Sequence, residues 1–451
     1  MFHVEIFAKS IEDLLKLNQF SLDLKETSAH EKDNQFVIEG ILSDEQITEL
    51  SESHYKVEII RDLKEIAKER ALEVTLAENR FEDSAKMSGL EAQFHDAALT
   101  GYMNVDEVES ALISLKENHP DIASMIELPH KTWEKRTSRA LRVRLGDTTS
   151  SNRVGILFTG STHAREWGGS DICVTFLVTL INAYASKSSL VYGNKTFTIE
   201  QMKNIENVDI FVFPDVNPDG KNYSQTFDSG SDEDLWWRKN RNPQNQGVDI
   251  NRNYDFLWSS GIGTSDDPES PNYKGNSSFS EPEAQNVRYL LDNYGNMQYL
   301  VDVHSHGELI LYNWGDDDNQ ADDEKQNFRN PAFDGKRGIP RDLSYREFMP
   351  TADESIEVGL ANRMNLALEE VNGRRYIVQQ GVRLYPTSGT LRDYAFSRHF
   401  AENVNRKIYS FTIEFGKEFV PPFSEMKNII KEVNAAMIEF CVAVGSRSGD
   451  T

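Results

Sequence analysis

The stretch VGILFTGSTHAREWGG, residues 154–169, is the part of the sequence from which the fold can be worked out. Its first residues, Val154–Thr159, form an apolar run with β-branched members, which predicts a buried strand. Polar residues follow, and the apolar run Asp171–Ala185 then predicts a helix. A strand, a polar loop and a helix in this order are typical of an α/β sheet, in which functional residues gather in the loop.

Apolar strands and helical stretches continue to alternate beyond this unit. The predicted strands are Val208–Pro214, Gln298–His304 and Ile408–Phe415, and the predicted helices are Glu281–Asn293 and Glu354–Glu370. Near-continuous apolar strands belong to sheets that are covered by helices on both faces. The predicted fold class is therefore α/β.

The N-terminal residues predict a separate small unit. Strands are expected at His3–Phe7, Leu22–Thr27, Phe36–Leu42 and Tyr55–Ile60, with helices at Ile11–Leu17 and from Ser43 to about Ser53. The order βαββαβ is the split ferredoxin-like pattern, an α+β arrangement. Residues 63–96, rich in Lys, Glu, Arg and Ala at first, predict a helical connector. The expected division is a small domain at 1–62, a connector at 63–96 and a large α/β domain at 97–445.

Composition limits the classes of function. The 451 residues include 48 basic and 73 acidic side chains, a formal net charge of −25, which excludes a general nucleic-acid binder. No run approaches the roughly 18 apolar residues of a membrane helix, and the first residues lack the layout of a signal peptide. We therefore expect no membrane partner, and either a cytoplasmic chain or a secreted one whose upstream signal was trimmed. Cys173 and Cys441 lie in apolar runs, so no disulfide is expected.

One segment is strongly biased in composition. Residues 315–324 contain Asp316, Asp317, Asp318, Asp322 and Asp323. The simplest interpretation is a solvated acidic loop. A calcium site is the alternative, although the spacing matches no EF-hand loop.

Candidate metal ligands stand at the ends of two predicted strands. His163 and Glu166 lie three residues apart in the first loop, and imidazole with carboxylate suits zinc, although the pair alone is a weak signal. The strand that contains Asp302 offers a third ligand, His304 or His306, which share one strand face. We choose His304, because it is nearer to the carboxyl end of the strand, where sites in open α/β sheets lie. One zinc ion per chain is expected, and another divalent ion could occupy the same ligands.

The sequence resembles the zinc carboxypeptidase family of the carboxypeptidase A and B type over roughly residues 102–444. His163-x-x-Glu166 resembles the first two metal ligands of that family, and His304 its third. The resemblance implies a mixed, mostly parallel, twisted sheet with helices on both faces. It also implies a peptidase that removes the C-terminal residue of peptides and proteins.

Further positions follow from the resemblance. The catalytic glutamate falls on Glu414, and the arginine that polarises the scissile carbonyl falls on Arg241 in the segment WRKNR. Substrate-binding positions fall on Asn251, Arg252 and Tyr385, and Asp249 falls on the partner that orients His163. Arg165, in the first loop, is also expected to bind substrate. These roles suit the residue types, because a carboxylate can take a proton from water and a guanidinium keeps its charge. Arg252 with Asn251 would form a fork for a free carboxylate.

The position of Arg392 bears on specificity. In the family, the corresponding position lies at the base of the pocket for the C-terminal side chain, so a guanidinium there favours acidic C-terminal residues. Alternatively, Arg392 pairs with Asp393. Because the acidic surface repels acidic substrates, Arg165, Arg241, Arg252 and Arg392 would have to supply a local positive field within about one Debye length of ~8 Å.

The N-terminal unit resembles the pro-domain of family zymogens. This implies an activating protease as a partner, with candidate cleavage points at Lys68, Arg70, Arg80 and Lys86. A permanent accessory domain is the alternative. Three rival functions also remain open at the level of sequence: a cell-wall peptide amidase with the same zinc chemistry, a non-catalytic peptide-binding relative, and an acidic interaction module.

Overall fold

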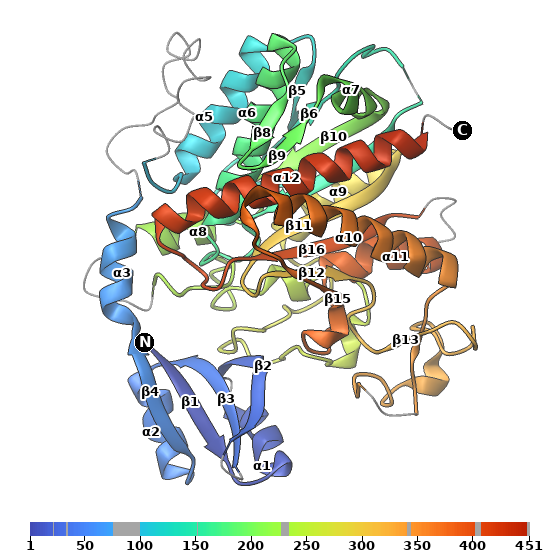
Figure 1. Cartoon of the computed structure of the whole chain (residues 1–451). Helices are drawn as coiled ribbons and strands as arrows, with labels where there is room; N and C mark the ends of the chain where they lie inside the picture. The colour runs from blue at the N-terminus through green and yellow to red at the C-terminus, as the bar shows by residue number, and fades with distance from the viewer. Residues whose placement is uncertain are drawn as a thin grey trace.

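The computed structural model describes residues 1–20, 22–32, 35–74, 100–150, 152–226, 234–340, 344–401 and 407–448. A small N-terminal sheet lies below a large sheet that is sandwiched between helices (Figure 1). The apolar run that begins at Val154 forms β7 (Val154–Gly160), and α6 (Gly168–Ser186) follows the polar loop. The predicted strand–loop–helix unit is thus present.

The large sheet has the strand order β15-β12-β16-β11-β7-β10-β6-β5. Its other strands are β5 (Ala123–Glu127), β6 (Arg139–Val143), β10 (Val208–Phe213), β11 (Met297–Ser305), β12 (Leu309–Tyr312), β15 (Ile377–Gln380) and β16 (Tyr409–Phe415). The four central strands β16, β11, β7 and β10 are parallel, whereas β6 and β12 run antiparallel to their inner neighbours. The predicted α/β class with a mixed, mostly parallel sheet is confirmed.

Helices cover both faces of this sheet, because side chains alternate along each strand. Ile156 and Phe158 of β7 belong to one apolar core with α5, α6, α10 and α12. Leu157, between them, belongs to a second core with α9 and α11. The helices are α5 (Val105–Asn118), α9 (Pro282–Asn293), α10 (Thr351–Asn372), α11 (Leu391–Ala401) and α12 (Phe423–Ser448). Shorter elements complete the domain: α7 (Ile199–Met202), α8 (Pro218–Gln225), β8 (Leu190–Tyr192), β9 (Lys195–Phe197), β13 (Asn319–Gln320) and β14 (Glu347–Phe348).

The N-terminal unit has the predicted order of elements. These are β1 (Phe2–Ala8), α1 (Ile11–Lys16), β2 (Asp23–Lys32), β3 (Gln35–Leu42), α2 (Asp44–Glu52) and β4 (Lys56–Asp62). The sheet order is β2-β3-β1-β4, with antiparallel neighbours. Ser43 caps α2, since its Oγ accepts from the backbone N–H of Gln46 (3.3 Å) while Gln46 Oε1 accepts from the N–H of Ser43 (3.0 Å).

The connector is described only in its first part. α3 (Leu63–Ala71) follows β4 directly, and residues 75–99 lie outside the described residues. Two of the four candidate cleavage points, Arg80 and Lys86, fall in that range. Lys68 is exposed but lies within α3, and Arg70 is buried, with its Nε donating to the carbonyl oxygen of Val420 (3.0 Å). Arg70 is therefore shielded from a protease in this structure, whereas Lys68 is not.

The acidic segment at residues 315–324 is solvated only in its second half, where Asp322 is exposed, and its first half is buried. Asp316 and Asp317 are fully buried, and Asp318 is nearly so. The backbone N–H of Gly338 donates to Asp317 Oδ2 (2.9 Å), and Arg383 pairs with Asp318 (2.8 Å). Distant segments thus fold over these side chains, which composition alone does not reveal.

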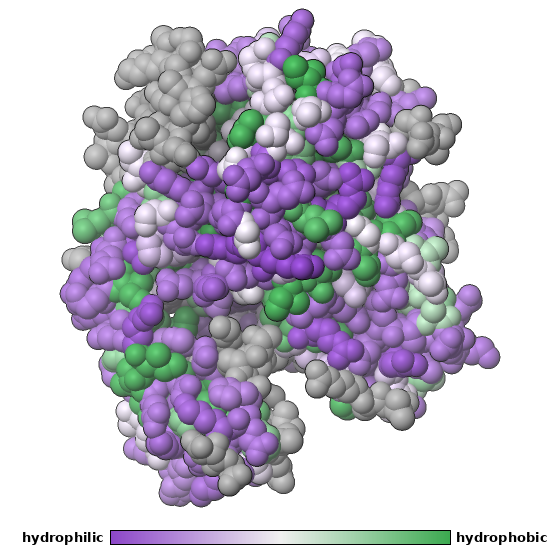
Figure 2. Space-filling view, in the orientation of Figure 1, coloured by the Kyte–Doolittle hydropathy of each residue, from purple (hydrophilic) through white to green (hydrophobic). Residues whose placement is uncertain are grey.

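The surface visible in Figure 2 is largely hydrophilic, and the most apolar long helix is buried. On the face shown in Figure 2, hydrophilic residues predominate and apolar residues are scattered. α6 is long and apolar enough to cross a membrane by length and composition alone, but 78% of its most apolar window is buried inside the protein. Cys173 in α6 and Cys441 in α12 are both buried and free, as expected.

Candidate active site

The loop between β7 and α6 brings His163 and Glu166 together. The backbone N–H of Glu166 donates to the carbonyl oxygen of His163 (3.1 Å), which forms a tight turn. Gly169 allows the first turn of α6 to pack against this loop, because a Cβ atom there would lie 2.7 Å from the backbone nitrogen of Ser161. As a result, Nδ1 of His163 lies 2.7 Å from Oε1 of Glu166.

His304, at the carboxyl end of β11, completes a three-residue cluster. Its Nδ1 lies 3.1 Å from Nδ1 of His163 and 3.0 Å from Oε2 of Glu166. One ligand atom from each residue lies within 4.8 Å of the others, and all three side chains are buried. No other group of three such residues converges within the described ranges. His306 lines the cavity beside the cluster, with its ring 4.5 Å from that of Phe419.

The outer nitrogen of each histidine faces a carboxylate. His163 Nε2 lies 3.2 Å from Asp249, whose other oxygen accepts from Arg238 Nη2 (2.9 Å). His304 Nε2 lies 2.7 Å from Asp302. A carboxylate accepts a hydrogen bond from a ring N–H, so these contacts favour a proton on each Nε2, and both Nδ1 atoms face the centre of the cluster.

Electrostatic effects in this cluster favour bound positive charge. Burial raises the pKa of Glu166, but the imidazoles of His163 and His304 more than offset it and lower the pKa well below its usual range. Burial likewise opposes the charge on His304, yet Asp302 and Glu166 raise its pKa well above 6.5. The cluster therefore holds either protons or a metal cation between its ligand atoms.

The donor set fits zinc. Two imidazole nitrogens and one carboxylate, with room for a water molecule, form the usual protein ligands of a catalytic zinc ion. The carboxylates behind the histidines hold the rings in the orientation that this coordination needs. His163, Glu166 and His304 are thus the residues that would hold the metal.

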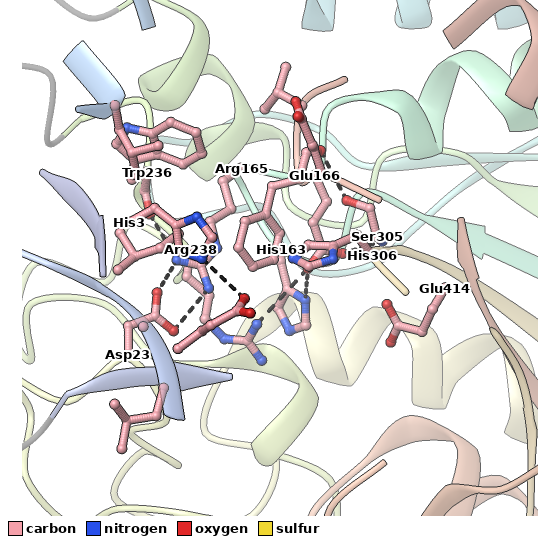
Figure 3. A pocket seen from close by; sticks show the side chains of 18 of the residues that line it. His3, Asp23, His163, Arg165, Glu166, Trp236, Arg238, Ser305, His306 and Glu414 are labelled. Atoms are coloured by element: carbon pink, nitrogen blue, oxygen red, sulfur yellow. Dashed lines mark hydrogen bonds and ion pairs between the residues drawn. The ribbon is translucent and has the colours of Figure 1, made fainter. Parts of the chain in front are cut away.

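Glu414 faces the cluster from the neighbouring strand. β16 pairs with β11 in parallel register, and Glu414 is the partner of His304. Figure 3 shows the carboxylate pointing toward the ligands across the cavity. Burial raises the pKa of Glu414 to about 7, with His304 opposing and Glu166 adding to the shift. A carboxyl group with such a pKa is suited to exchange protons near neutral pH.

The arginine beside the cluster is Arg238. Its Nε and Nη2 donate to Asp249 Oδ2 (3.0 and 2.9 Å), and its Nη1 lies 4.0 Å from Glu166 Oε1. Arg241, which we expected in this position, instead lies outside the cavity and stacks on the rings of Tyr223 and Trp237. The structure therefore places Arg238, and not the expected Arg241, beside the metal-ligand cluster.

Asn251 and Arg252 line the same cavity from a short 3₁₀ turn, Ile250–Arg252. Arg252 is almost fully buried, and its Nε donates to the carbonyl oxygen of Gly263 (2.8 Å). Its Nη2 lies 3.4 Å from the Tyr385 hydroxyl, which brings the predicted tyrosine to the fork. Gly389 has φ +68, and a Cβ atom there would lie 2.3 Å from the carbonyl oxygen of Arg252, so glycine is needed for this approach.

Arg392 is buried and does not line the cavity over the metal ligands. Its Nη2 and Nε lie 3.2 and 3.4 Å from the carboxylate of Asp393, the pairing that we considered as the alternative. The guanidinium occupies space left by two glycines, since a Cβ atom on Gly381 would lie 2.1 Å from Nη2 and one on Gly315 2.4 Å from it. Leu391, the preceding residue, donates its backbone N–H to Asn251 Oδ1 (2.9 Å).

The N-terminal unit forms one wall of the cavity, whose volume is about 280 Å³. Asp23 of β2 pairs with Arg165 through both carboxylate oxygens, one of them 3.1 Å from Nη2 (Figure 3). The Arg165 guanidinium also lies over the Phe419 ring, 4.0 Å from its centroid. Arg165, which we expected to bind substrate, thus lines the cavity, and its partner there is the acidic Asp23 of this same chain.

Three residues of the site were not predicted from the sequence. Arg238 is three residues before the arginine that we chose, in a loop without periodicity. Asp302 shares a strand face with His304, and this spacing of two residues was a usable signal. Asp23 carries no local signal, because its role depends on how the two units pack.

Comparison with known proteins identifies the family of this chain. A family model described as zinc carboxypeptidase matches residues 108–436. Carboxypeptidase B of Astacus astacus is 33% identical over 230 residues, which are 50% of this chain and 68% of that protein. Carboxypeptidase A4 of Mus musculus is 26% identical over 344 residues, 75% of this chain and 68% of that protein. The crystal structure of thrombin activatable fibrinolysis inhibitor shares the fold over 99% of both chains, with a TM-score of 0.69 at 18% identity. The chain belongs to the zinc carboxypeptidase family and is a metallocarboxypeptidase.

Proposed function

We propose that this enzyme removes single residues from the C-termini of peptides and proteins with the help of one zinc ion. The observation that supports this most directly is the shared cavity. The ligands His163 and Glu166, the carboxyl group of Glu414 and the fork of Asn251 and Arg252 all line it.

Zinc held by this cluster would lower the pKa of a bound water molecule and polarise a carbonyl group. Glu414 then takes the proton of the attacking water and gives it to the leaving amine, which its pKa of about 7 permits. Arg238 is permanently charged and fixed by Asp249, so it stabilises negative charge on the carbonyl oxygen without exchanging protons.

The fork limits the reaction to chain ends. Arg252 is held rigidly by backbone carbonyls of Gly263 and Asn251, and it can bind a free carboxylate through a charge-assisted pair. A substrate whose terminal carboxylate is replaced by an amide lacks this contact. We therefore expect a blocked dipeptide to be cleaved and its C-terminal amide to resist cleavage. Equal cleavage of both would contradict an exopeptidase.

We further propose that acidic C-terminal residues are preferred substrates. Arg392 directly follows Leu391, whose backbone N–H donates to Asn251 of the fork. Asp393 does not depend on Arg392, because Asn313, Gly315 and Thr390 donate to it at 2.7–3.1 Å, whereas the contacts from Arg392 are 3.2 and 3.4 Å. The guanidinium can thus also serve a substrate carboxylate.

Two variants test this preference. R392A should lower the ratio of kcat/KM for Glu-ended over Phe-ended peptides, whereas R383A, which removes an arginine outside the cavity, should leave it unchanged. G381A should act in the same direction as R392A, because its Cβ atom would displace the guanidinium. An unchanged ratio in R392A would contradict the proposed role of Arg392 in an acidic preference, but it would not contradict the carboxypeptidase activity.

The N-terminal unit is proposed to restrain the enzyme until the connector is cut. The carboxylate of Asp23 pairs with the guanidinium of Arg165, and Arg61 of β4 pairs with Glu418 (3.3 Å) across the same interface. Both contacts cover cavity-lining residues that a peptide substrate would need. Limited trypsin treatment should cut the chain between residues 75 and 99 and raise the activity. A cut without activation would favour a permanent accessory domain.

A further inference from the structure

Asp302 is a buried carboxylate whose contacts all concern the metal-ligand cluster or its supporting strand. Its Oδ2 lies 2.7 Å from His304 Nε2, and its Oδ1 accepts from the hydroxyl group of Thr159 (2.7 Å). Thr159 is its register partner on β7, one strand away. Asp302 and His304 are two residues apart on β11, so the strand itself aims both side chains to the same face.

This carboxylate differs from the one behind His163. Asp249 shares its charge with Arg238, which donates two hydrogen bonds to it. In the described part of the chain, no arginine or lysine pairs with Asp302, and Thr159 is a neutral donor. The full negative charge of Asp302 therefore acts on the imidazole of His304.

From this geometry, we propose that Asp302 is a positioning residue for the metal site, which rests on the proposed zinc function. By accepting the Nε2 proton, it fixes the tautomer in which Nδ1 of His304 faces the metal position. Its uncompensated charge also makes that nitrogen a stronger donor. Zinc affinity would thus depend on a contact built into two adjacent strands, independently of the loop that carries Asp249.

The test is the zinc affinity of purified full-length variants, measured at equilibrium by competition with a chromophoric chelator. D302N keeps the shape and a hydrogen-bond acceptor but removes the charge, and it should weaken zinc binding about 10- to 100-fold. D249N, whose charge is already offset by Arg238, should weaken binding no more than D302N. D209N is a matched control, because Asp209 is a buried carboxylate on β10 that pairs with Arg142, away from the cluster.

Zinc saturation separates positioning from folding. Affinities are compared per folded molecule, with the fold checked by circular dichroism, and D302N should regain most of its kcat at saturating zinc. If D302N does not fold, T159V keeps the carboxylate and removes only its anchor, with an expected loss of affinity of about 2- to 10-fold.

Three outcomes decide the matter. Weaker zinc binding in D302N or T159V, with D209N unchanged, supports the proposal. Wild-type affinity in a folded D302N, or an equal loss in D209N, overturns it. Absence of zinc binding by the wild-type chain would instead overturn the zinc function on which the proposal rests.

Discussion

Replacement of Arg238 by alanine should impair catalysis far more than the same replacement of Arg241. The two arginines are three residues apart, yet only Arg238 lies at the cluster, with its Nη2 2.9 Å from Asp249 and its Nη1 4.0 Å from Glu166. Removal of one preorganised donor to a developing negative charge costs a factor of about 10² to 10³ in kcat, or roughly 2.7–4 kcal/mol. We expect a loss of this size for R238A.

The expected effect of R241A is much smaller. Its guanidinium is partly exposed and stacks on Tyr223 and Trp237, an interaction worth about 0.5–1 kcal/mol to stability. Because no contact of Arg241 reaches the metal ligands, kcat should stay within about twofold of the wild type, as for an ordinary surface change. R241A is therefore the matched control for R238A.

The assay is release of the terminal residue from a blocked dipeptide, with kcat and KM determined separately and zinc content measured for each variant. R238A leaves Asp249 without its main cation, so a fall in zinc content would show that the loss comes from the metal site. A loss of kcat at full zinc content supports a direct role on the carbonyl oxygen. An equal loss in R241A, or wild-type kcat in R238A, would refute the assignment.

Three further predictions concern inhibition, pH and metal. D23A removes the partner of Arg165 and should weaken docking of the N-terminal unit by about 2 kcal/mol, or roughly 30-fold. The uncut D23A chain should therefore gain activity, whereas the control D44N, on exposed α2, should not. Unchanged activity in D23A would show that this contact does not contribute to inhibition. Burial raises the pKa of Glu283 from 4.5 to about 8, so this group stabilises the fold fully below pH 4.5 and loses that contribution as pH rises through 8. The unfolding free energy of E283Q relative to the wild type should therefore rise between pH 5 and 9, and a constant difference would contradict the buried neutral carboxyl group. A chelator should lower the melting temperature and abolish activity, and added zinc should restore both, because a ligand that binds only the folded state stabilises it. A melting temperature that does not change with the chelator would argue against a bound metal.

The sequence predicted the parts of the fold whose signals are local. β7, β11 and β16 are long and apolar and contain β-branched residues. α6 and α10 are long enough for their composition alone to predict a helix. The strands at the sheet edges, such as β12 and β15, have four residues each, too few for a reliable pattern. Their pairing partners supply the stability that their own sequence lacks.

The site was predictable where ligands follow strand ends. His163, Glu166, His304 and Glu414 all stand at the carboxyl ends of neighbouring parallel strands or directly after them, so the sheet brings them together. Arg238 was missed because the loop that carries it has no periodicity, and two arginines in it were equally suitable as charges.

The remaining errors concern long-range packing. The aspartates at residues 316–318 are buried because segments near Gly338 and Arg383 fold onto them. The pairing of Asp23 with Arg165 joins residues 142 positions apart. No local sequence pattern predicts either contact, since each forms only in the assembled fold.

The most direct test of the account is release of the last residue from blocked dipeptides that end in Glu, Phe or Lys, before and after trypsin, with and without a chelator. We predict release that the chelator abolishes, that trypsin increases and that is fastest for Glu. No release from any of these peptides under any condition, from a chain that binds zinc, would contradict a carboxypeptidase.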